Sequence, residues 1–96
     1  MTAQIRDVAG DMAVFVRVVE ASGFSAAGRA LGLSPSAVSK VISRLEDRLG
    51  ARLLNRTTRS LSVTDEGRAY FERSRQILAE IEAAEQSVSR VGDRPR

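Results

Sequence analysis

Residues 25–50 read SAAGRALGLSPSAVSKVISRLEDRLG, and this stretch decides the fold. Ser25 is suited to cap a short helix over residues 26–31, because its side-chain oxygen can accept hydrogen bonds from the free N–H groups of a first helical turn. Gly32 would end this helix, since glycine adopts at little cost the left-handed conformation that closes a helix. We therefore expect a short helix followed by a tight turn.

A second helix start follows at once in Ser34-Pro35. Serine at the cap supplies an acceptor, and proline at the first helical position has no N–H to leave unpaired. The helix is predicted to run to Leu49 and to end at Gly50. A short helix, a glycine-containing turn and a second amphipathic helix form the pattern of a helix-turn-helix.

The second of these helices has two distinct faces when it is drawn at about 100° per residue. The apolar face consists of Val38, Val41, Ile42, Leu45 and Leu49. The opposite face is rich in hydroxyl groups and consists of Ser36, Ser39, Lys40, Ser43 and Asp47. Short polar side chains would let such a helix approach base edges in the major groove of DNA. Any amphipathic surface helix has a polar face, however, so the neighbouring segments must decide.

The segment before residue 25 is predicted to form one more helix. Asp11 can cap this helix, which would end at Ser22-Gly23. Its apolar residues follow the i, i+3, i+4, i+7 spacing of a buried stripe. They are Met12, Phe15, Val16 and Val19.

After Gly50 the pattern changes from helical to alternating, which predicts a short β-hairpin. Its inward residues would be Leu53, Leu61 and Val63. Its tip would be Arg56-Thr57-Thr58-Arg59, in which two arginines could hold phosphates or enter a narrow minor groove. Taken alone, such a tip is more often a solvated polar turn. Beside the polar helix face, we favour a nucleic-acid contact.

A long last helix is predicted from Thr64, its cap, to about Val91. Its apolar positions have a heptad spacing that Ser74 interrupts. They are Tyr70, Ile77, Ile81, Ala84, Val88 and Val91. A helix of about 27 residues spans roughly 40 Å, which exceeds the small body of the domain. We therefore expect its C-terminal half to pair with the same helix of a second copy, through Ile77, Leu78, Ile81, Ala84 and Val88.

Composition excludes several classes of function. The 96 residues suffice for one small domain and contain neither cysteine nor histidine. Disulfides, the common zinc sites, thiol nucleophiles and imidazole bases are therefore excluded, and we predict no enzyme, no metal and no cofactor. No apolar run approaches the roughly 20 residues of a membrane span, and the first residues lack a signal-peptide pattern. We expect a cytoplasmic protein.

The net charge of +3 is distributed unevenly. Residues 1–24 carry a charge of −1 and residues 65–91 a charge of −2, whereas residues 25–64 hold seven basic side chains and two acidic ones. This middle segment is therefore the candidate surface for a polyanion. A protein-interaction module with the same fold is the competing hypothesis, but a protein partner seldom needs so many basic side chains on one surface.

In order and spacing these motifs resemble the N-terminal domain of LysR-type transcriptional regulators, over nearly the whole chain. The matching motifs are Phe24-Ser25-Ala26-Ala27, Leu33-Ser34-Pro35-Ser36-Ala37-Val38-Ser39, Ile42-Ser43-Arg44-Leu45-Glu46, Leu49-Gly50, Leu53-Leu54-Asn55-Arg56 and Thr64-Asp65-Glu66-Gly67. The resemblance implies a mainly α winged helix-turn-helix, with three helices, a short β-hairpin wing and a long fourth helix that links and dimerises. It also implies a bacterial, nucleoid-associated homodimer that binds double-stranded promoter DNA at interrupted palindromes, and a higher oligomer for the intact regulator.

The resemblance assigns domains and contacts by position. Residues 1–63 would be the DNA-binding domain, residues 64–91 the dimerisation helix, and residues 92–96 the start of a hinge to an absent effector-binding domain. The implied DNA contacts are Ser25, Pro35, Ser36, Ser39, Lys40, Ser43, Arg56 and Arg59. To these we add Ser34, at a helix start that can face a phosphate, and Thr58, at the hairpin tip. Two residues depart from the family pattern. Gly28 stands where alanine is common, which weakens the helix by about 1 kcal/mol in propensity, and Leu54 stands where phenylalanine is usual.

Overall fold

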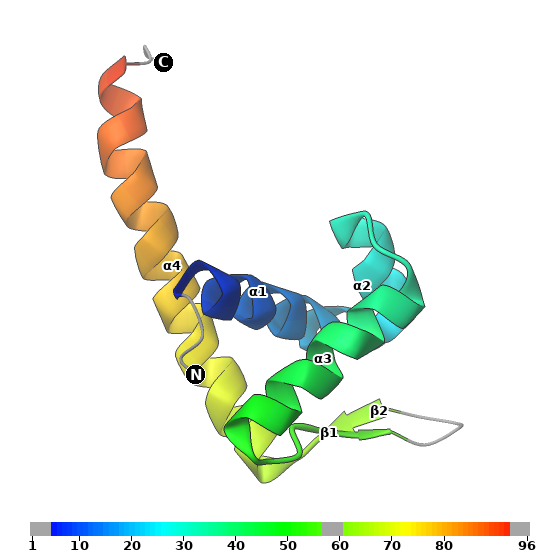
Figure 1. The fold of residues 1–96 in the computed structure, drawn as a ribbon. Coiled ribbons are helices and arrows are strands. Elements are labelled where there is room, and N and C mark those ends of the chain that lie inside the picture. The colour runs from blue at the N-terminus through cyan, green and yellow to red at the C-terminus, as the bar shows by residue number, and fades with distance from the viewer. Residues whose placement is uncertain (1–4, 57–60, 93–96) are drawn as a thin grey trace.

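The computed structural model describes residues 5–56 and 61–92. Its elements are α1 (Ile5–Ala21), α2 (Phe24–Leu31), α3 (Pro35–Leu49), β1 (Leu54–Arg56), β2 (Leu61–Val63) and α4 (Asp65–Gly92). Figure 1 shows the first three helices packed together, the two strands beside α3, and α4 running out of this body. The predicted winged helix-turn-helix, mainly helical, is confirmed.

Helix α1 contains Asp11 in its interior, so the prediction that Asp11 caps the helix was wrong. Asp11 is only 7% exposed. Its carboxylate lies 2.9 Å from the Arg44 guanidinium and 3.7 Å from that of Arg48, both on α3. A carboxylate before an apolar stripe can act as a cap or as a buried partner for arginine. Here it is a buried partner, because α3 packs on α1 and brings two arginines to it.

Helix α2 begins at Phe24, two residues before the predicted start. Gly23 occupies the cap position without a side-chain hydrogen bond, and Ser25 is exposed in the first turn. The prediction that Ser25 caps this helix was therefore wrong. The predicted end is confirmed, because Gly32 adopts the left-handed conformation with φ 72°.

The turn between α2 and α3 brings two backbone segments into contact. The Leu33 N–H donates to the Gly28 carbonyl at 2.9 Å. A Cβ added to Gly28 would lie 2.4 Å from the Leu33 carbonyl oxygen. Gly28, which weakens α2 in propensity, therefore lies where the turn passes too close to the helix to leave room for a side chain.

Helix α3 begins and ends as the sequence predicts. The Ser34 hydroxyl accepts a hydrogen bond from the Ala37 N–H at 3.1 Å, and Pro35 occupies the first turn. Gly50 ends the helix with φ 68°, and its N–H donates to the Glu46 carbonyl at 2.8 Å. These caps are local, so the sequence alone suffices to locate them.

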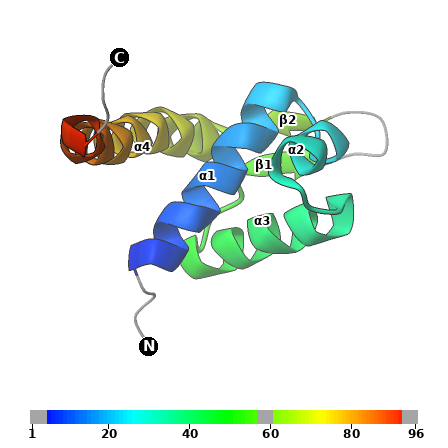
Figure 2. The same ribbon diagram turned by 90° about the horizontal axis from the view of Figure 1, so that it is seen from above.

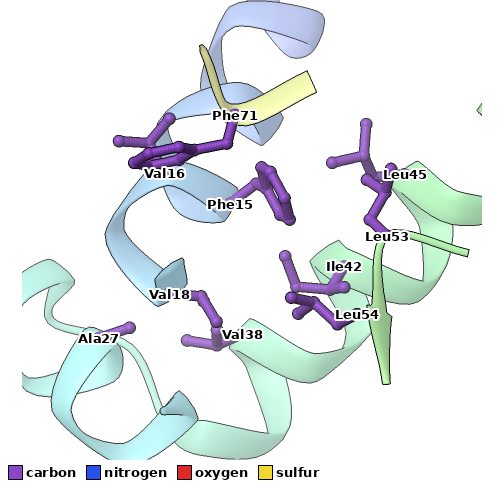
Figure 3. Close-up of a cluster of buried hydrophobic side chains, with 10 residues drawn as sticks. All are labelled: Phe15, Val16, Val18, Ala27, Val38, Ile42, Leu45, Leu53, Leu54 and Phe71. Atoms are coloured by element: carbon purple, nitrogen blue, oxygen red, sulfur yellow. The ribbon is translucent and has the colours of Figure 1, made fainter. Parts of the chain in front are cut away.

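The hydrophobic core lies between α1, α3 and the start of the hairpin. Figure 3 shows Phe15 extending from α1 between Phe71 and the side chains of α3. The buried apolar residues are Phe15, Val16, Val18, Ala27, Val38, Ile42, Leu45, Leu53, Leu54 and Phe71. Leu49 was predicted to point inward, but it is 40% exposed because it is the last residue of α3, at the surface.

The predicted hairpin is present as an antiparallel pair of strands. Leu54 pairs with Val63, and Arg56 pairs with Leu61. Leu54 is fully buried, and Leu61 and Val63 pack against the core from β2. The hairpin is therefore fixed to the body by its apolar side chains.

Thr64 joins the hairpin to α4. Its hydroxyl accepts a hydrogen bond from the Gly67 N–H at 2.9 Å and donates to the Arg52 carbonyl at 2.6 Å. Its own N–H donates to the Leu53 carbonyl at 3.0 Å. Thr64 thus caps α4, as predicted, and also fixes the direction in which the helix leaves the hairpin.

Helix α4 packs on the body only along its first half. The Tyr70 ring lies 5.6 Å from that of Phe15, and Ser74, which interrupts the heptad spacing, is fully buried. Residues 79–89 are all exposed, and Figures 1 and 2 show this half of α4 pointing away from α1, α2 and α3. Neither α4 nor any other described helix is long and apolar enough to cross a membrane.

Candidate nucleic-acid interface

One side of α3 is polar and open to solvent, and we call Ser36, Ser39, Lys40 and Ser43 the polar face of α3. Ser36, Lys40 and Ser43 are exposed and Ser39 is half-buried, while Ser34 and Pro35 are exposed just before them. The opposite side packs into the core through Val38, Ile42 and Leu45. In Figure 2 the start of α3 and the hairpin strands lie on the same side of the molecule, away from the end of α4.

The charge on this side of α3 is positive near its start. Lys40 is exposed and makes no ion pair with any residue that the structure describes. Arg44 and Arg48 pair with Asp11 on α1 instead of with acids of α3. Within α3 itself, Asp47 is the only exposed acidic side chain. An unpaired ammonium among short hydroxyl side chains suits an anionic or hydrogen-bonding partner.

Arg56 lies in β1 rather than in the hairpin loop where the sequence placed it. Its guanidinium donates to the Ser39 hydroxyl at 3.2 Å and lies 3.5 Å from the Ser43 hydroxyl. It also stacks over the Phe24 ring, 5.2 Å from the ring centre. Arg56 therefore connects the hairpin with the polar face of α3.

Glu46 holds the hairpin against α3 and was not identified as a site residue from the sequence. It is 8% exposed. One carboxylate oxygen accepts hydrogen bonds from the Leu53 and Leu54 N–H groups, at 2.8 and 3.1 Å. The other lies 3.5 Å from Arg56 and 3.8 Å from Arg52. The signal was available, because Glu46 falls four residues after Ile42 and hence on the apolar side of the helix.

The remaining predicted contacts lie in two places. Ser25 is exposed at the start of α2. Thr58 and Arg59 fall outside the described residues. The predicted site residues that can be placed are therefore grouped at the starts of α2 and α3, along the polar face of α3, and in β1.

Four of the five predicted dimerisation residues are exposed on α4. Ile77 is 38% exposed and Ile81 43%, and Ala84 and Val88 are also exposed. Leu78 is half-buried and packs against the core of its own domain. Together, the exposed four make an apolar stripe on a helix that nothing else in the described chain covers.

The comparison with known families decides the identity of the fold. A family model described as "Bacterial regulatory helix-turn-helix protein, lysR family" matches residues 10–68. The chain belongs to this family. The matched residues contain the whole of α2 and α3, both strands and the start of α4.

Two HTH-type transcription regulators match this chain closely over one part of their length. The HTH-type transcriptional regulator CrgA of Neisseria meningitidis serogroup C is 49% identical over 86 residues, which is 90% of this chain and 29% of CrgA. The HTH-type transcriptional activator AaeR of Escherichia coli K12 is 46% identical over 71 residues, 74% of this chain and 23% of AaeR. The chain thus spans less than a third of the length of these relatives.

Solved structures of CrgA, BenM and CbnR share the fold. The structure of CrgA superposes with a TM-score of 0.72 at 46% identity, covering 95% of this chain and 29% of CrgA. A complex of the BenM DNA-binding domain with benA site 1 DNA gives a TM-score of 0.80 at 27% identity, covering 88% of this chain and 98% of that one. A complex of the CbnR DNA-binding domain with DNA gives 0.76 at 31% identity, covering 90% and 98%.

Proposed function

We propose that this domain binds double-stranded promoter DNA sequence-specifically as part of a LysR-family transcription regulator in the bacterial cytoplasm. The polar face of α3 would enter the major groove, and the hairpin would contact the adjacent backbone or minor groove. The observation that carries the proposal is the exposed, hydroxyl-rich polar face of α3, where Lys40 forms no ion pair with a residue of the described ranges 5–56 and 61–92. The likeness to two DNA-binding domains solved with DNA supports it.

The positive charge of residues 25–64 and the exposed start of α3 also support this role. Residues 25–64 hold seven basic side chains against two acidic ones, and one of those acids, Glu46, is buried in ion pairs. Ser34 and Pro35 are exposed, so the start of α3 is accessible to solvent. The free N–H groups at the start of a helix favour the binding of a phosphate. Positive charge and helix geometry therefore favour the same surface.

We also propose that two copies pair through the exposed apolar stripe of α4 and place two polar faces on one palindromic site. Residues 1–63 would then be the DNA-binding unit and residues 64–91 the dimerisation helix. The support is that the stripe made by Ile77, Ile81, Ala84 and Val88 has no cover within the described chain. An apolar stripe of this kind is stabilised when a second helix covers it.

The test is to select duplexes from a random library with the purified 96-residue chain and to measure their affinity by fluorescence anisotropy over a range of salt concentrations. The logarithm of affinity should fall by about 0.9 per phosphate contact for each tenfold rise in salt. Selection should enrich a sequence with two inverted half-sites. A chain that enriches no sequence, or binds with no salt dependence, would contradict the proposal.

A further inference from the structure

Arg56 is held in place from three directions before any partner binds. Ser39 and Ser43 contact its guanidinium from α3, Phe24 lies under it from α2, and Glu46 lies beside it. Its side chain is 28% exposed, whereas that of Arg52, which pairs with the same carboxylate, is 67% exposed. Arg56 is therefore fixed in direction rather than free to follow a phosphate.

The charge of Glu46 decides which partner suits Arg56. The charge of the Arg56 guanidinium is already partly compensated by the buried Glu46 carboxylate, which Arg52 shares. Arg56 therefore gains less from a phosphate than Lys40, which forms no ion pair with a described residue. A base edge is neutral and does not compete with the carboxylate. Arginine can donate two parallel hydrogen bonds to the O6 and N7 atoms of guanine, provided that its orientation is fixed.

Glu46 also fixes the position of Arg56 relative to α3. One of its oxygens binds the Leu53 and Leu54 N–H groups at the start of the hairpin, and the other lies near Arg56 at the end of β1. Because Glu46 belongs to α3, the position of the hairpin strand and the direction of the arginine are both set from the helix that carries the polar face.

Resting on the proposed function, we infer that Arg56 extends the polar face of α3 as a specificity-determining residue that binds a guanine edge, and that Glu46 is its positioning residue. The base-contacting surface is then composite, with hydroxyls from α3 and a guanidinium from β1. Sequence preference depends on the ion pair between Glu46 and Arg56, although Glu46 itself does not touch DNA.

The experiment compares the affinity of each variant for the selected duplex with its affinity for a scrambled duplex of equal length. Arg56→Lys keeps the positive charge but loses the planar guanidinium that can donate two parallel hydrogen bonds. The ratio of the two affinities should fall by about tenfold, the lower end of what one bidentate base contact contributes. The dependence of affinity on salt should stay as in the wild type, because the charge is unchanged.

Glu46→Gln removes the carboxylate charge but keeps an oxygen that can accept from the hairpin N–H groups. It should lower the same ratio by a similar factor, and the double variant should lose no more than Arg56→Lys alone, because both changes remove one interaction. Arg52→Lys is the matched control, since Arg52 pairs with the same carboxylate but, among the described residues, the hydrogen bonds to the Ser39 and Ser43 hydroxyls come from Arg56. The ratio of its affinities for the selected and the scrambled duplex should equal that of the wild type.

The inference is overturned if Arg56→Lys keeps the wild-type ratio, or if the losses of the two single variants multiply in the double variant. Should Glu46→Gln fail to fold, as judged by thermal unfolding, the comparison of Arg56→Lys with Arg52→Lys decides alone. A wild-type chain that selects no duplex overturns the proposed function. If the wild type selects a duplex but Arg56→Lys keeps the wild-type ratio of affinities, only the role inferred for Arg56 is overturned.

Discussion

The Asp11 carboxylate of α1 lies 2.9 Å from the Arg44 guanidinium of α3, and Arg48 approaches the same carboxylate at 3.7 Å. The side chain of Asp11 is only 10% exposed, whereas that of Arg44 is 63% exposed. This ion pair joins the second half of α3 to α1. It therefore helps to set the angle at which the polar face of α3 is presented.

Asp11→Ala should lower the free energy of unfolding by about 1 to 2 kcal/mol, because it removes the charge-assisted hydrogen bond from Arg44 and the ion pair with Arg48, while both arginines can still reach water. Asp11→Asn keeps one acceptor for Arg44 and should cost less. Asp7→Ala, at an exposed position of the same helix, is the control and should change little. Urea unfolding followed by circular dichroism measures all three. Equal losses for the alanine variants at 7 and 11 would contradict this role.

Gly67 and Gly10 should respond to alanine in opposite ways. A Cβ on Gly67 would stand 2.0 Å from the Leu53 carbonyl oxygen and 2.8 Å from a Val63 methyl carbon. Gly67→Ala should therefore destabilise the fold by about 1 to 3 kcal/mol through overpacking, despite the better helix propensity of alanine.

Gly10 lies inside α1, where an added Cβ meets nothing within 4 Å. Gly10→Ala should therefore stabilise the protein by about 0.5 to 1 kcal/mol. The melting temperatures of the two variants should move in opposite directions from that of the wild type. A rise in both would show that the hairpin can move away from the start of α4.

Ser34→Ala should destabilise the domain by about 1 kcal/mol, because it removes the acceptor for the Ala37 N–H at the start of α3. Ser36→Ala changes an exposed serine within the first turn of the same helix and should have a much smaller effect. Chemical denaturation separates the two, and Ser34→Gly should fall between them. If Ser36→Ala costs as much as Ser34→Ala, the cap has been misassigned.

Ile81→Asp should abolish or weaken dimerisation by placing a charge in the exposed stripe of α4. Ile81 is 43% exposed and lies beyond the part of α4 that packs on the body, so the fold should be unaffected. Ala83→Asp adds the same charge on another side of the helix and should leave the dimer intact. Sedimentation velocity gives the mass of each species. A wild type that sediments as a monomer at all concentrations would refute the dimer.

Lys40→Gln should weaken binding to every duplex and reduce the slope of log affinity against log salt by about 0.9, if its ammonium neutralises one phosphate. Loss of a base contact as well would appear as a change in the selected sequence. Arg17→Gln is the control of equal charge, because Arg17 pairs with Glu20 on α1. A salt slope that drops equally in both variants would mean that only total charge matters.

Much of the fold was predictable because the interactions that decide it join residues close to one another in the sequence. Ser34, Gly32, Gly50 and Thr64 begin or end helices through groups within a few residues of them. The polar face of α3 follows from helical periodicity, and the projecting half of α4 follows from its length. The LysR family could be identified from the order of these motifs, and the family model confirms it.

Only the tertiary structure decided the roles of the charged residues between elements. Asp11 was predicted to be a cap but is a buried partner of α3, and Arg56 was predicted to lie in the hairpin loop but contacts α3 from β1. Glu46 was not identified as a site residue, yet it holds the hairpin against α3. The physical reason is that a charged side chain takes whichever partner the folded chain brings near. Arg44 and Arg56 find theirs 33 and 10 residues away, on elements whose approach local periodicity does not specify.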